Sequence, residues 1–190
     1  MSSAGGLKIS DTRPLIVSAV FDAGAQGWLE GLRRAHYPPE RNLVPAHLTL
    51  FHGLPGSALG EVSRLLARAA GEFGAMAADF RGWEMRDSGG HFAVAMRVDC
   101  RALEGLRDEL AEALWLVMGA QDRAGAWLHV TVQNKVGRSA ARATLAALAG
   151  ERAPVAPRVA GLRLWHYAGG PWETAGAWSF RGLSRGGGLR

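Results

Sequence analysis

The chain has 190 residues, of which 48% are hydrophobic and 21% are charged, a composition that excludes a disordered protein. Its 22 basic residues outnumber 17 acidic ones, and since only Lys8 and Lys135 are lysines, the excess consists of arginine, which suits an anionic partner. A single cysteine, Cys100, excludes an internal disulfide bond and a cysteine-based metal site. With no signal peptide and no apolar run long enough to span a bilayer, we expect a cytoplasmic protein without membrane contact.

The first half of the chain predicts two strands and two helices. An apolar run over 14–21 predicts a buried strand, and Asp22 can cap the helix that follows it. The prolines at 38–39 end this helix. A second strand is predicted after Pro45, and an apolar stripe predicts a helix over 59–73.

The second half predicts five strands and two helices. In chain order they are a hairpin of strands 79–86 and 91–99, a helix over 102–118, a strand over 127–133, a helix over 139–148, and strands 159–167 and 177–182 around a turn at 169–171. Trp28 and Trp115 fall on predicted helices and are expected in the core. The resulting order is β-α-β-α-β-β-α-β-α-β-β.

One short phrase occurs twice, as His47-Leu48-Thr49-Leu50 and as His129-Val130-Thr131-Val132, with 82 residues between the two histidines (129 − 47). Because side chains alternate along a strand, each phrase places its His and Thr on one face and two apolar residues on the other. Threonine favours strands and half-buried histidines are common, so a purely structural explanation exists. Two imidazoles on apolar strands gain nothing for packing, however, and the repetition therefore indicates a functional site.

These elements predict an α+β fold for residues 14–182, in a single bilobal domain. Each of its two similar lobes would consist of antiparallel strands with helices outside, and a central cleft would carry one His-x-Thr phrase per lobe. Residues 1–13 and 183–190 are expected to be flexible.

The two phrases, their separation and the order of elements around them resemble the 2H phosphoesterase superfamily, which contains bacterial 2′-5′ RNA ligases and RNA 2′,3′-cyclic phosphodiesterases. The resemblance implies a bilobal fold with one motif on a central strand of each lobe. It also implies His47 as proton donor and His129 as proton acceptor. Many members carry a basic residue just after the second motif, where this chain has Gln133-Asn134-Lys135.

The expected function is metal-independent hydrolysis of cyclic phosphodiesters, either RNA 2′,3′-cyclic phosphate ends or small cyclic nucleotides, with 2′-5′ ligation as the reverse reaction. Histidine can serve as acid or base near neutral pH, and the hydroxyls of Thr49 and Thr131 can donate hydrogen bonds to the phosphate oxygens. We expect no cofactor and no metal, because no Asp, Glu or Cys lies beside either phrase at ligand spacing. The partners would be RNA ends or a cyclic nucleotide, and the protein would be a monomer.

Four further residues are candidates for substrate binding because arginine, lysine and aromatic rings hold phosphates and stack on bases. They are Lys135, Arg97, Trp165 and Tyr167. His52 follows His47 by five residues, so we expect it on the opposite face of the strand, as a loop or packing residue. His91 is expected to be exposed and His166 semi-buried.

The sequence is also compatible with two other functions. The same cleft could capture RNA or nucleotides without turnover, which would make the protein a binding module. The enzyme could also act on a non-RNA cyclic phosphate, such as a derivative of ADP-ribose. Turnover of a small panel of cyclic phosphates would separate these alternatives.

Overall fold

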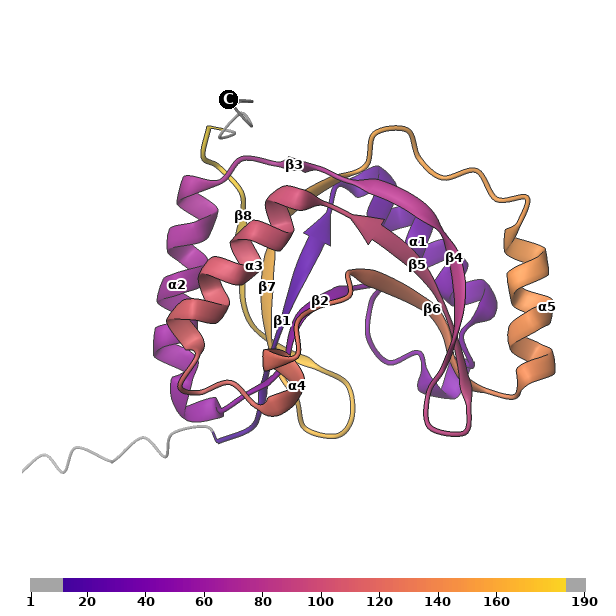
Figure 1. Ribbon diagram of the computed structural model, residues 1–190, viewed down its shortest axis with the longest axis horizontal. Coiled ribbons are helices and arrows are strands. Elements are labelled where there is room, and N and C mark those ends of the chain that lie inside the picture. Colours follow the sequence, from indigo (N-terminus) through magenta and orange to yellow (C-terminus); the bar gives the residue numbers. More distant parts are fainter. Residues whose placement is uncertain (1–11, 184–190) are drawn as a thin grey trace, which may run out of the picture.

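The computed structural model describes residues 12–183, and Figure 1 shows them as an α+β fold built on one eight-stranded antiparallel sheet. The order across the sheet is β3-β7-β1-β2-β6-β5-β4, and β8 pairs with β7. The strands are β1 (Leu15–Phe21), β2 (Leu48–Leu54), β3 (Met76–Ala77), β4 (Asp79–Asp87), β5 (Phe92–Asp99), β6 (His129–Val136), β7 (Arg158–His166) and β8 (Glu173–Ser179).

Five α-helices in the described part of the chain flank the sheet: α1 (Ala23–His36), α2 (Leu59–Glu72), α3 (Arg101–Leu114), α4 (Ala120–Arg123) and α5 (Arg138–Leu148). Short 3₁₀ turns occupy Pro39–Arg41 and Gly56–Ala58. Helix α1 follows β1 but packs mainly on β6, where α5 also packs, whereas α3 follows β5 and packs against α2 and β3. In Figure 1, α2 and α3 therefore lie at one end of the molecule and α5 at the other.

The sheet divides into two halves that are joined at a single pair of residues. The first half-sheet comprises β3, β7, β8, β1 and β2, and the second comprises β6, β5 and β4. Strands β2 and β6 pair antiparallel where Leu48 lies opposite Val130, both of them fully buried. The apolar members of the two His-x-Thr phrases therefore anchor the junction: Leu48, Leu50 and Val130 belong to the main core cluster. Val132 belongs to a second cluster, together with Leu32 and Leu148.

Asp22 shows how one side chain positions two elements. Its Oδ1 accepts a hydrogen bond from the Ala25 backbone N–H at 3.0 Å, which caps α1 as the sequence predicts. Its Oδ2 accepts from the Arg158 backbone N–H at 2.6 Å, at the start of β7. The hydrogen bond from Ala25 holds the pKa of this carboxyl below its usual value, so the carboxylate stays charged and links α1 to the sheet.

The predicted elements agree with the structure in kind and order, but the helix expected over 102–118 ends at Leu114, the last strand is displaced, and two short elements are missing from the prediction. The last strand occupies Glu173–Ser179 rather than 177–182, and within it the Trp178 ring lies directly against Gly176, where a side chain would collide with it. Strand β3 and helix α4 are absent from the prediction because two and four residues carry no periodic signal. Trp115 is 54% exposed at the end of α3, so its expected core position is wrong; Trp28, in contrast, packs on Phe80.

Residues 1–11 and 184–190 lie outside the described part of the chain, and so do nearly all the positions expected to be flexible. Arg13, at the edge of the described part, forms an ion pair with Glu173 at 2.7 Å. No helix within residues 12–183 is both long and apolar enough to cross a membrane.

Candidate active site

The two His-x-Thr phrases lie on adjacent strands. Since β2 and β6 run antiparallel with Leu48 opposite Val130, His47 lies across from Thr131, and Thr49 lies across from His129. These four side chains are partly exposed, while their apolar neighbours in the phrases are buried. The sheet thus brings two imidazoles and two hydroxyls to one face, related by an approximate twofold arrangement.

Each imidazole is oriented by the backbone two residues before it. His47 Nδ1 lies 2.7 Å from the carbonyl oxygen of Pro45, and His129 Nδ1 lies 2.7 Å from the carbonyl oxygen of Trp127. A carbonyl can only accept, so Nδ1 carries the proton in both rings. This leaves both Nε2 atoms to meet a ligand, as proton acceptors when the ring is neutral and as donors when it is charged.

Burial favours the neutral form of both rings. The pKa of His47 is lowered to about 4, first by desolvation and then by the positive charges of Arg33 and His129, against the opposing hydrogen bond to Pro45. Desolvation also lowers the pKa of His129, with a contribution from Arg86. An anionic ligand placed between the rings would reverse this effect, because its charge favours the imidazolium.

Both histidines contact a tryptophan. The Trp127 ring stacks on His129 with centroids 4.1 Å apart, and the guanidinium carbon of Arg86 lies 4.1 Å from the centroid of the same Trp127 ring. Trp172 lies 4.6 Å from His47 at a tilt of 47°. Aromatic packing on each imidazole restricts its rotation and excludes water from one side of it.

Two pockets flank the motifs. One of about 150 Å³ is lined by His47 together with Ser18, Arg163 and Trp165. The other, of about 210 Å³, is lined chiefly by side chains of β4, β5 and β6 and by one residue before β6. Its members are Arg86, Asp87, Ser88, Ala93, Ala95, Trp127, His129, Thr131 and Asn134. An arginine therefore stands in each pocket beside a motif histidine.

The other predicted binding residues take different positions around this site. Arg97 lies opposite His129 in the β5–β6 register and forms an ion pair with Asp99 at 3.4 Å. Trp165 is only 4% exposed, and its indole N–H donates to the Ser18 hydroxyl at 2.8 Å. Tyr167 is 43% exposed at the end of β7.

Lys135 lies away from both pockets. It sits at an irregular point of β6, where its φ angle is 59°, a left-handed conformation uncommon for lysine. Its neighbour Asn134 occupies the pocket that His129 lines. Asn134 also accepts a hydrogen bond from the Lys135 backbone N–H at 2.8 Å.

His52 stands on the same face as the motifs, so its expected position on the opposite face is wrong. The β1–β2 register shifts between Val17 and Ser18, which leaves both Leu50 and Phe51 opposite Val17. Leu50 and Phe51 are fully buried, as expected for the two residues of a β-bulge. The bulge reverses the alternation beyond it and returns His52 to the side of Thr49.

Comparison with known proteins identifies the family. The profile of the 2′-5′ RNA ligase superfamily matches residues 21–171, which include both His-x-Thr phrases. The chain belongs to the 2′-5′ RNA ligase superfamily. No curated protein shows a significant sequence match.

Several solved structures have a similar fold. The structure of TT0787 from Thermus thermophilus is similar with a TM-score of 0.61 and 18% identity, over 89% of this chain and 98% of the other. LigT of E. coli complexed with 3′-AMP gives a TM-score of 0.54 at 17% identity, over 90% and 99% of the two chains. LigT complexed with phosphate gives 0.52 at 18% identity, over 89% and 98%.

Four side chains around the motifs were not predicted from the sequence: Arg33, Arg86, Trp127 and Trp172. Arg33 is 2% exposed, and its Nη1 donates to the Thr131 carbonyl oxygen at 2.7 Å. Its Nε donates to Asn42 Oδ1 at 2.8 Å, in the segment before β2. The only indication of Trp127 in the sequence is its position two residues before a motif histidine. Nothing in the sequence indicates that Arg33, one of several arginines in the chain, is buried beside the motifs.

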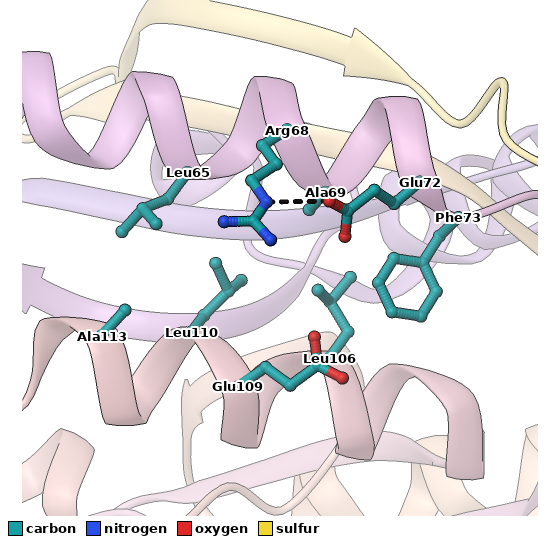
Figure 2. Close-up of a pocket in the computed structure, with 9 residues that line it drawn as sticks. All are labelled: Leu65, Arg68, Ala69, Glu72, Phe73, Leu106, Glu109, Leu110 and Ala113. Carbon is teal, nitrogen blue, oxygen red and sulfur yellow. Dashed lines mark hydrogen bonds and ion pairs between the residues drawn. The ribbon is translucent and has the colours of Figure 1, made fainter.

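Elsewhere, Figure 2 shows a groove between α2 and α3 lined by leucines and by an Arg68–Glu72 pair at 2.8 Å. None of the residues that line this groove comes from β2 or β6, so the groove is separate from the two motifs. Among residues 12–183, no group of three or more His, Cys, Asp or Glu side chains is arranged to hold a metal ion.

Proposed function

We propose that this protein hydrolyses the cyclic phosphodiester of RNA 2′,3′-cyclic phosphate ends or of small cyclic nucleotides, with His47 and His129 as acid and base. The observation that carries the proposal is the pair of imidazoles on adjacent strands, each with Nδ1 bonded to a backbone carbonyl and Nε2 available. The phosphate would bind in a cleft between the two half-sheets, with one motif on each side.

In this mechanism the two histidines transfer one proton each. His129 accepts a proton from water while the water oxygen bonds to phosphorus, and His47 donates a proton to the ribose oxygen whose bond to phosphorus breaks. These roles follow the resemblance to 2H phosphoesterases. Thr49 and Thr131 donate hydrogen bonds to the non-bridging oxygens as negative charge develops on them. When a ribose 5′-hydroxyl replaces water as the nucleophile, its oxygen bonds to phosphorus, the bond from phosphorus to the 3′-oxygen breaks, and the product is a 2′-5′ bond.

The ligands of the similar structures support a nucleotide substrate. LigT of E. coli has been solved with 3′-AMP, NADP⁺, phosphate and ATP, all of which present phosphate oxygens. The chain also carries a net charge of +5, and an arginine lines the pocket beside each motif histidine. Arginine binds phosphate oxygens through paired donors.

The test is turnover of a panel in the presence of EDTA: 2′,3′-cyclic mononucleotides, an oligoribonucleotide with a cyclic end, and a cyclic phosphate of ADP-ribose. Hydrolysis of the first two with EDTA present is the expected result. Tight binding without turnover would identify a capture module instead, and turnover of the ADP-ribose compound alone would move the substrate outside RNA. Activity that EDTA abolishes and added metal restores would contradict the metal-independent mechanism.

A further inference from the structure

His52 is a third histidine on the face that carries the motifs, and the proposed mechanism gives it no role. Its side chain is 41% exposed, in contrast to the core residues Leu50 and Phe51 that precede it. Its positive charge, when present, acts on both His47 and His129, which places it within electrostatic range of the two. The β-bulge is what brings it there.

Asp122 fixes His52 through three contacts. One carboxylate oxygen of Asp122 accepts from the His52 backbone N–H at 2.8 Å and lies 3.2 Å from His52 Nδ1. The other accepts from the Gly53 backbone N–H at 3.2 Å. Both backbone donors lie beyond the single position at which β2 pairs with β6, and the carboxylate supplies their acceptor. The ring is thereby held by Nδ1, and Nε2 remains for a ligand.

Asp122 is itself held in place. It is 3% exposed, and although burial alone would raise the pKa of its carboxyl, the hydrogen bonds from His52 and Gly53 keep the pKa below its usual value. Arg107, which is 6% exposed, donates from Nη2 to the Asp122 carbonyl oxygen. The Arg107 guanidinium also lies 5.2 Å from the centroid of Phe51, in the bulge. Arg107 thus holds the backbone of Asp122, and the Asp122 carboxylate in turn holds the partly exposed His52.

We propose that His52 is an anion-binding residue of the site, positioned by Asp122, and that its Nε2–H donates to an oxygen of the bound phosphate. The identity of this ligand rests on the proposed function. With a phosphate oxygen at Nε2 and a carboxylate at Nδ1, the ring carries a proton on each nitrogen and donates in both directions. Such a contact is made to the ground state as well as to the transition state, so its loss weakens binding more than turnover.

The test compares His52→Ala with the parent in two measurements. Sulfate affinity, measured by calorimetry, reports anion binding without chemistry, and steady-state kinetics on a 2′,3′-cyclic nucleotide separates KM from kcat. Loss of one charge-assisted hydrogen bond should raise both the sulfate Kd and KM by about tenfold or more, with kcat within about threefold of the parent. His91→Ala removes an exposed imidazole just before β5, which Asp122 does not hold, and should change neither value.

Asp122→Asn tests the positioning. It should raise the sulfate Kd and KM in the same direction as His52→Ala while kcat stays near that of the parent, a split that general loosening of the fold would not produce. Unchanged sulfate affinity in His52→Ala would overturn the proposal, whether or not kcat falls. If the parent hydrolyses no cyclic phosphate but His52→Ala still weakens sulfate binding, the proposed function fails and the anion site stands.

Discussion

At the scale of single residues, the chemistry depends on how each imidazole is held. His47 and His129 use the same device, a hydrogen bond from Nδ1 to the carbonyl oxygen two residues earlier, and this fixes the tautomer without any carboxylate partner. Desolvation lowers the pKa of both rings. The free protein therefore holds two neutral imidazoles near neutral pH, and phosphate binding must supply the charge that retains the catalytic proton.

This predicts the pH dependence of kcat/KM, which reports the ionisation of the free enzyme. Catalysis needs one neutral and one protonated ring. Because both pKa values lie below the ordinary 6.5, and that of His47 is about 4, the singly protonated form is most abundant below pH 6.5 and declines as the pH rises. We expect a bell-shaped profile with its maximum on the acid side of 6.5. A maximum at pH 7 or above would show that the free-state pKa values are not lowered.

The threonines should act on the transition state. Thr49→Val and Thr131→Val keep the branched shape that suits a strand but remove the hydroxyl, so each should lower kcat by about 10- to 100-fold with little change in melting temperature. Thr49→Ser and Thr131→Ser restore the hydroxyl and serve as matched controls in the same kinetic assay. Full activity in either valine variant would remove that threonine from the mechanism.

At the scale of secondary-structure elements, α1 connects the two motif strands through Arg33. This buried guanidinium bonds to the carbonyl oxygens of Val44, before β2, and of Thr131, within β6. Its charge also contributes to the low pKa of His47. One helix residue therefore connects the segment before β2 to β6 and adds positive charge near His47.

Arg33→Met is accordingly expected to lower the free energy of unfolding by about 3 kcal/mol, because several buried acceptors lose their donor. Chemical denaturation measures this, and Arg34→Met is the matched control, since Arg34 is the exposed neighbour on the same helix. Equal stabilities of the two variants would mean that the Arg33 contacts contribute nothing net.

Secondary-structure elements differ in how well they can be predicted from the sequence. Period-two and helical patterns suffice to predict the strands that carry both His-x-Thr phrases and the main helices, because each pattern is local. The bulge at Leu50 and Phe51 depends on how β2 pairs with β1, and no local pattern reveals it. His52 was therefore expected on the opposite face, and Asp122 on the short helix α4 was missed as its partner.

At the scale of the whole molecule, the site lies where two half-sheets meet. A single paired position, Leu48 opposite Val130, joins them, and α1, which follows β1 of the first half-sheet, packs on β6 of the second. Residues 82 positions apart in the chain thus reach one face of one sheet. The repeated phrase signalled this arrangement, but the tryptophans and arginines around it come from segments whose positions depend on the complete fold.

The most direct test of the account is the rate of hydrolysis of a 2′,3′-cyclic mononucleotide by the parent, His47→Ala and His129→Ala. Circular dichroism and melting temperature should confirm that both variants remain folded, since both side chains are partly exposed. Each imidazole contributes an acid or base step, so each variant should lose about 10²- to 10⁴-fold in kcat. Turnover at the parent rate by either folded variant would contradict catalysis by the histidine pair.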